Sequence, residues 1–124
     1  MRHRVKKRKL GKLTKHRKHM LRNLLRALFE HGKIETSKAK AKEVQRLADK
    51  LISTARGGDL AARRQLHRFF GKNDVVNLLV DEIAPLFKDR KSGFTRLTET
   101  GRRRGDNTLM ARLELIKKPD AEQK

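Results

Sequence analysis

The sequence predicts an α+β domain in which four helices precede a β-hairpin. Two observations support this class: apolar residues recur with helical spacing between residues 17 and 87, and the spacing changes to a period of two after Gly93. A length of 124 residues suits one compact core, so residues 16–116 are expected to form a single globular domain. Residues 1–15 lack sustained periodicity and are expected to form a basic extended arm, and the polar residues 117–124 a disordered tail.

The first two helices are marked by the residues at their ends. The first is expected over residues 17–31, because its apolar side chains gather on one side and Gly32 follows as a C-terminal stop. Residues 33–36 alternate in polarity and indicate a brief strand. A hydroxyl group at position 36 or 37 then offers an N-cap for a second helix, which runs to about Arg56 and is closed by two glycines.

The next two helices are shorter. Asp59 is a candidate N-cap for the third helix, and Gly71 is its stop signal. Asn73 is a candidate N-cap for the fourth, whose apolar residues again recur at helical spacing. Pro85 lies late in this helix. Because proline has no N–H and its ring crowds the preceding turn, we expect the helix to end or become distorted near Ala84.

A hairpin is expected at the end of the domain. Residues 94–100 and 108–116 alternate between apolar and polar side chains, which is typical of strands. The residues between them, 101–107, contain enough Gly, Asp and Asn to turn the chain. Three consecutive arginines are therefore expected at the tip of a long hairpin.

The charge of the chain is strongly positive and unevenly placed. The formal net charge is +20, from 34 Lys and Arg against 14 Asp and Glu. Met1–Phe29 holds twelve Lys or Arg and no acidic residue, because the first acid is Glu30. Like charges at this density repel one another, so a polyanionic partner is expected to neutralise them. A basic arm on a moderately basic body is typical of nucleic-acid-binding proteins.

Composition and motifs exclude several other classes. Cysteine is absent, which excludes a disulfide framework, a thiolate nucleophile and a cysteine zinc site. The chain has no membrane-spanning apolar run and no secretory signal, so a cytoplasmic location is expected. His16 and His19 lack a third metal ligand nearby, and no phosphate cradle or nucleophile motif occurs. We therefore expect no enzymatic activity, no cofactor, no metal and no small-molecule substrate.

Aromatic usage bears on the choice between RNA and DNA. Trp and Tyr are absent, and four of the five Phe residues lie at core positions of the expected helices. Phe94 is the remaining candidate for base stacking, although a buried strand residue fits it better. Recognition of backbone and shape is therefore favoured, which suits structured RNA. A nucleoid-type architectural DNA-binding protein stays the main alternative, and a cationic membrane-active protein built on residues 17–31 is a weaker one.

The candidate RNA-binding residues are cationic side chains of the arm, of the start of the first helix and of the hairpin tip. Each would neutralise a phosphate and release condensed counterions. A stripe on the second helix, formed by Lys38, Lys42, Arg46 and Lys50, fits phosphate contact and a solvated face equally well. The candidate RNA-binding residues are Arg2, His3, Arg4, Lys6, Lys7, Arg8, Lys9, Lys12, Lys15, His16, Arg17, Lys18, Arg22, Arg102, Arg103 and Arg104.

Short motifs follow one another over nearly the whole chain, to about Ile116. They are Met1-Arg2-His3-Arg4, His16-Arg17, Met20 with Arg22-Asn23, Ile34-Glu35-Thr36-Ser37, Lys40-Ala41-Lys42-Glu43, Gly93-Phe94-Thr95-Arg96-Leu97, Gly101 to Asn107, Met110-Ala111 and Leu113-Glu114-Leu115. In this order they resemble the bacterial large-subunit ribosomal protein L seventeen family. The resemblance implies four helices packed with a small mixed three-stranded sheet.

The same resemblance implies a function. It implies binding to large-subunit rRNA near the rim of the peptide exit tunnel, beside neighbouring large-subunit ribosomal proteins. Together with the charge layout, it leads to the hypothesis of a structural constituent of the large ribosomal subunit that binds and stabilises rRNA and supports translation. A ribosomal, cytoplasmic location follows, without contact to a membrane.

Overall fold

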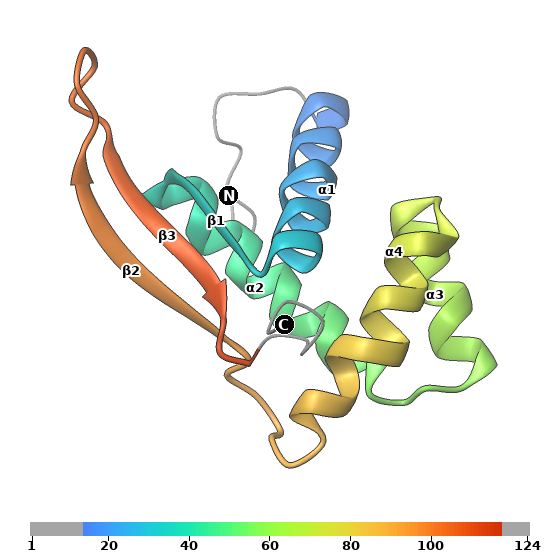
Figure 1. Cartoon of the computed structure of the whole chain (residues 1–124). Coiled ribbons are helices and arrows are strands. Elements are labelled where there is room, and N and C mark those ends of the chain that lie inside the picture. Colours follow the sequence, from blue (N-terminus) through green and yellow to red (C-terminus); the bar gives the residue numbers. More distant parts are fainter. Residues whose placement is uncertain (1–13, 118–124) are drawn as a thin grey trace, which may run out of the picture.

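The computed structural model describes residues 14–117, which form four helices and one sheet (Figure 1). The α+β class is confirmed. The expected arm and tail lie outside the described residues, except for Thr14, Lys15 and Lys117. In chain order the elements are α1 (Thr14–His31), β1 (Lys33–Ser37), α2 (Lys38–Ala55), α3 (Leu60–Phe70), α4 (Asn73–Asn77), a π-helical segment η1 (Leu78–Ile83), a 3-10 turn η2 (Ala84–Phe87), β2 (Thr95–Arg102) and β3 (Leu109–Leu115).

Helix α1 begins at Thr14, three residues earlier than the apolar pattern indicates. Lys15, which the sequence places in the arm, is therefore part of the first helical turn. Lysine and arginine have high helix propensities, so the helix extends into a stretch that has no apolar periodicity. Further along, Leu25 and Leu28 are fully buried and hold α1 against the rest of the domain.

The sheet has the order β1-β3-β2, and both pairs of neighbours are antiparallel. The expectation of a mixed sheet is therefore wrong. A mixed sheet needs two adjacent strands that run in the same direction. Strands β1 and β2 do run in the same direction, but β3 lies between them and pairs with both. The last strand of the chain thus occupies the centre of the sheet.

The sheet has one face against the helices. Ala111, Leu113 and Leu115 of β3 are buried, whereas Arg112 between them is exposed. Helix α2 packs against all three strands. Helices α1 and α2 lie between the sheet and the pair formed by α3 and α4 (Figure 1). The outward face of the sheet carries polar and charged side chains.

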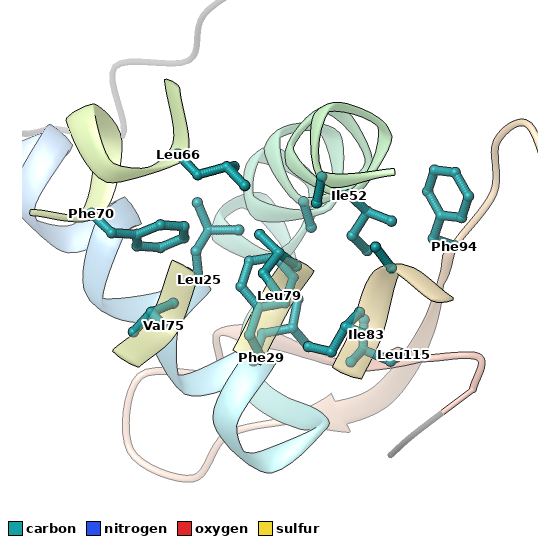
Figure 2. Close-up of a cluster of buried hydrophobic side chains, with 14 of the residues drawn as sticks. Leu25, Phe29, Ile52, Leu66, Phe70, Val75, Leu79, Ile83, Phe94 and Leu115 are labelled. Carbon is teal, nitrogen blue, oxygen red and sulfur yellow. The ribbon is translucent and has the colours of Figure 1, made fainter. Parts of the chain in front are cut away.

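One hydrophobic core joins these layers. Leu25 and Phe29 of α1, Ile52 of α2, Leu66 of α3 and Leu79 of η1 converge in it (Figure 2). Each has at most 1% of its surface exposed, so each stabilises the fold by about 1.5–3 kcal/mol relative to an exposed position. This core fixes the helices that carry the basic surface.

Phe94 belongs to this core as well. Its ring lies edge-on to that of Phe87, with 5.2 Å between the centroids, and 1% of its surface is exposed. The guanidinium of Arg56 lies 5.8 Å from the centre of the same ring. A side chain packed in this way is not available to stack on a base.

The fourth helix is irregular, as Pro85 predicts. After Asn77 its turns widen, and the Ala84 N–H donates to the carbonyl of Leu79, five residues back. In a regular α-helix the ring of Pro85 would clash with the carbonyl of Asp81. The wide turn and the 3-10 turn that follows accommodate the proline. The N-cap is Lys72, one residue before the expected Asn73, and it makes no side-chain cap.

Candidate nucleic-acid interface

The start of α1 gathers five of the candidate RNA-binding residues. Lys15, His16 and Lys18 are exposed, whereas Arg17 and Arg22 are partly buried. The first turn of the helix contains no acidic residue. These five residues, which were expected from the sequence to bind RNA, therefore lie within about two turns of one another on α1.

This arrangement is unfavourable for the isolated helix. The N-terminus of a helix carries a partial positive charge from its free N–H groups, which favours anions and disfavours cations by about 0.3–1 kcal/mol each. Lys15, Arg17 and Lys18 all lie in or beside the first turn of α1. The helix dipole therefore does not favour these cations, whereas a negatively charged partner would.

Arg22 and Arg26 extend the cationic surface along α1. They stand one turn apart, and both are partly buried. The Nε atom of each is shielded from solvent and has no hydrogen-bond partner among the residues that the structure describes. A partner could meet these two side chains only through their exposed parts, because the shielded Nε atoms cannot be reached from solvent. Arg26 was not among the residues expected from the sequence to bind RNA, although its spacing of four from Arg22 was a usable signal.

The hairpin tip brings the other three candidates together. Strand β2 runs to Arg102 rather than Thr100, because a bulge between Glu99 and Gly101 lets the strand continue. Gly101 has a φ of 120°, a conformation that favours glycine. Beyond the bulge, the Arg103 N–H donates to the Thr108 carbonyl over 2.8 Å.

Side chains tie this tip together. The Arg103 guanidinium donates to both carboxylate oxygens of Asp106, through Nη2 over 2.7 Å and Nε over 3.3 Å. Asp106 also accepts the Thr108 N–H over 3.1 Å. Hydrogen bonding from Arg103 first, and from Thr108 next, holds the pKa of Asp106 well below its usual value. The same pairing raises the pKa of Arg103. The Arg102 guanidinium donates to the Asn107 carbonyl over 3.1 Å.

The stripe on α2 is not one uniform surface. Lys38 pairs with Glu99 of β2, and this hydrogen bond is the main cause of the lowered pKa of Glu99. Arg46 pairs with the buried Glu43 over 2.6 Å. Lys42 and Lys50 are exposed. Two members of the stripe thus serve the fold, which leaves the other two for a partner or for solvent.

Helix α3 adds a cationic surface that the sequence analysis did not select. Arg64, His67 and Arg68 are exposed, and no ion pair within the described part of the chain involves them. Arg63 differs, because it donates to Asp81 over 2.7 Å and to Asn77 over 3.0 Å. The sequence signal available for this surface was the spacing of four between Arg64 and Arg68 on a short capped helix.

The arm candidates Arg2, His3, Arg4, Lys6, Lys7, Arg8, Lys9 and Lys12 lie outside the described residues. Between residues 14 and 117, no three His, Cys, Asp or Glu side chains come together in a way that would hold a metal ion. Within the same residues, no helix is both long and apolar enough to cross a membrane.

The described residues form a compact α+β body with a cationic helix start, an arginine hairpin tip and no exposed aromatic platform. These features are typical of proteins that bind the backbone of folded nucleic acids. Comparison with known families is more specific. Residues 20–116 match the family described as Ribosomal protein L17, and the chain belongs to this family.

Individual relatives agree over most of the chain. The large ribosomal subunit protein bL17 of Finegoldia magna is 51% identical over 94% of this chain and 92% of its own length. The proteins of that name from Desulfotalea psychrophila and Moorella thermoacetica are 50% and 47% identical, over 94% and 88% of this chain. They are covered over 90% and 97% of their own lengths.

Proposed function

We propose that this chain is a structural constituent of the large ribosomal subunit, and that it binds and stabilises large-subunit rRNA. Its relatives are named large ribosomal subunit proteins. The single observation that supports this most is the cationic start of α1, which opposes the helix dipole and has no acidic residue in its first turn. No finding favours the architectural DNA-binding alternative.

The two described cationic features lie at the same end of the molecule. The hairpin tip and the beginning of α1 both stand at the top of Figure 1, away from the η2 turn. A folded RNA that contacts one of these two features therefore approaches the end of the molecule that also carries the other. Phosphate groups would accept hydrogen bonds from the arginines and displace condensed counterions.

Neighbouring large-subunit proteins near the rim of the peptide exit tunnel are the proposed protein partners. The outward face of the sheet is better suited to contact a protein than to bind RNA, because its basic residues alternate with acidic ones. Glu114 of β3, for example, lies between Lys33 and Arg96 in the strand register. Binding of folded RNA requires positioning of charge rather than bond chemistry, so the proposed role is structural and not enzymatic.

Binding to RNA is tested with the purified full chain and an in vitro transcript of large-subunit rRNA. The variant Arg22→Gln/Arg26→Gln removes two charges from α1. The control Lys33→Gln/Arg96→Gln removes two charges from the outward face of the sheet, where Glu114 lies between them in the strand register. We expect the α1 variant to weaken binding about tenfold or more and to flatten its salt dependence, because two phosphate contacts are lost.

The outcome that contradicts the proposal is also defined. Equal loss in both variants would mean that net charge, rather than the α1 surface, determines binding. Tighter binding of the wild-type chain to duplex DNA of equal length at physiological salt would favour the DNA alternative. Thermal unfolding of each variant checks that the domain remains folded.

A further inference from the structure

We propose that Arg103 and Asp106 form a clasp that positions the hairpin tip, and that Arg104 is the tip arginine that meets RNA phosphate. This inference rests on the proposed function and assigns different roles to Arg103 and Arg104, which the sequence presents as equivalent. The clasp is defined as the Arg103–Asp106 side-chain pair. In this reading Arg103 and Asp106 are positioning residues.

The guanidinium of Arg103 is already occupied. Its Nη2 and Nε atoms point at the two oxygens of one carboxylate, which is the paired geometry that arginine also uses to bind phosphate. A phosphate at this site would have to displace Asp106 or approach a second anion. The charge of Arg103 is therefore compensated within the tip.

The clasp joins the two sides of a turn that would otherwise be flexible. Gly105 has a φ of 99° and Asn107 a φ of 59°, so the loop uses conformations that few residues favour. The Asn107 N–H donates to the Arg103 carbonyl over 2.9 Å, and Asp106 also holds the Thr108 N–H. Arg103 and Asp106 thus add side-chain bonds across a turn whose main-chain bonds are few.

Arg104 is the arginine left for a partner. It is exposed at the crest of the turn, and it makes no hydrogen bond or ion pair with another described residue. Because the clasp fixes the backbone on either side, Arg104 loses less conformational freedom when it binds. An ordered loop presents this cation to a phosphate in one position rather than many.

Charge and positioning predict opposite signs for one substitution. If Asp106 acted only through its charge, removing that charge would tighten the binding of a polyanion. If Asp106 acts as one half of the clasp, its removal weakens binding even though the chain becomes more positive. Asp106→Asn separates the two, because the amide keeps the shape and loses the charge-assisted pair.

The test uses the full chain and the same in vitro transcript of large-subunit rRNA. We expect Asp106→Asn and Arg103→Lys to weaken binding about threefold to tenfold, because the competent conformation of the tip becomes only partly populated. Neither should change the slope of log affinity against log salt. Arg104→Gln should weaken binding and reduce that slope by about 0.7–0.9, the share of one phosphate contact.

A matched control is available in Asp89, an exposed acid in the loop before β2. Asp89→Asn makes the same change in charge and should leave binding unchanged or slightly tighter. Amide relaxation measured by NMR should show faster motion of residues 103–107 in Asp106→Asn and not in Asp89→Asn. Binding by Asp106→Asn as tight as or tighter than wild type would overturn the clasp. Absence of RNA binding by the wild-type chain would instead overturn the proposed function.

Discussion

Asp49 is an acidic side chain in a place that favours its neutral form. It lies on α2 and accepts a hydrogen bond from the Thr95 hydroxyl over 3.2 Å. Partial burial raises the pKa of Asp49, because desolvation outweighs the hydrogen bonds from Thr95 and from the Phe94 backbone. A raised pKa in the folded state means that protonation stabilises the fold. This contribution is complete below the unfolded-state pKa and is lost as the pH rises through the folded-state pKa.

Replacing Asp49 by Asn should therefore stabilise the domain at neutral pH. The amide keeps an oxygen that accepts from Thr95, and it removes the partly desolvated charge. We expect the free energy of unfolding to rise by about 0.5 kcal/mol at pH 7, a small value because water screens a partly exposed group. Near pH 3 the gain should vanish, since Asp49 is then mostly protonated. Urea denaturation at both values measures it, and a loss of stability at pH 7 would contradict the prediction.

Some residue roles can be read directly from the sequence and others cannot. Asp59 accepts the Ala62 N–H over 2.8 Å, as its N-cap position predicts, because an N-cap depends on a few adjacent residues. The role of Arg103 was not predictable. Its partner Asp106 comes within reach only through a turn in which Asn107 adopts a positive φ. Sequence position alone made Arg103 equivalent to Arg104.

At the scale of elements, Gly71 separates α3 from α4. Its φ is 74°, and its N–H donates to the His67 carbonyl over 2.7 Å. A Cβ at this position would meet no atom within 4 Å, so a substitution there strains the backbone without a clash. The left-handed conformation, not lack of space, requires glycine here.

We expect Gly71→Ala to lower the free energy of unfolding by about 1–2 kcal/mol, the usual penalty for this conformation in a residue with a Cβ. Gly71→Asn should be less destabilising, because asparagine tolerates the left-handed region. Chemical denaturation of the two variants side by side measures the difference. Equal losses would point to a role of Gly71 other than its backbone conformation.

Local sequence signals predicted the approximate positions of the elements, but not their irregular turns and bulges. Pro85 correctly indicated an irregular helix, because the missing N–H and the ring act on the adjacent turn. Whether the chain accommodates this proline with a wide turn, as in η1, depends on how Leu79 and Ile83 pack in the core. The β2 bulge, which adds Arg102 to the strand, likewise depends on pairing with β3.

At the scale of the whole molecule, the arm adds charge to a body that has its own core. The residues before Thr14 contribute Lys and Arg but no acid. Deleting residues 1–13 should leave the thermal unfolding midpoint of the domain unchanged within error. Incorporation into large-subunit particles, measured by sedimentation of a lysate, should fall about tenfold or more, because many phosphate contacts are lost together.

A variant of unchanged length serves as the control for this deletion. Replacing the Lys and Arg of residues 1–13 by Gln keeps the length and removes the charge. If this variant is incorporated normally while the deletion is not, the arm acts through its length or shape instead. Unchanged incorporation of both would contradict a role of the arm in RNA binding.

The topology of the sheet lay beyond sequence reasoning from periodicity. Three strand segments were identified in place, since alternation is a local property. Their order depends on which segments pair, and Lys33 pairs with Glu114 across most of the chain. No local pattern encodes such a contact, so strand direction and order were the parts most open to error.

Because β3 is the central strand, the fold tolerates the loss of C-terminal residues less well than the loss of residues at the other end of the chain. A premature stop codon before Leu109 would remove the only neighbour that β1 and β2 have in the described sheet. Both ladders of the sheet would then be lost, and the bare strand edges left behind invite aggregation. Nonsense mutations late in the reading frame should therefore yield insoluble, rapidly degraded products that still display their cationic segments.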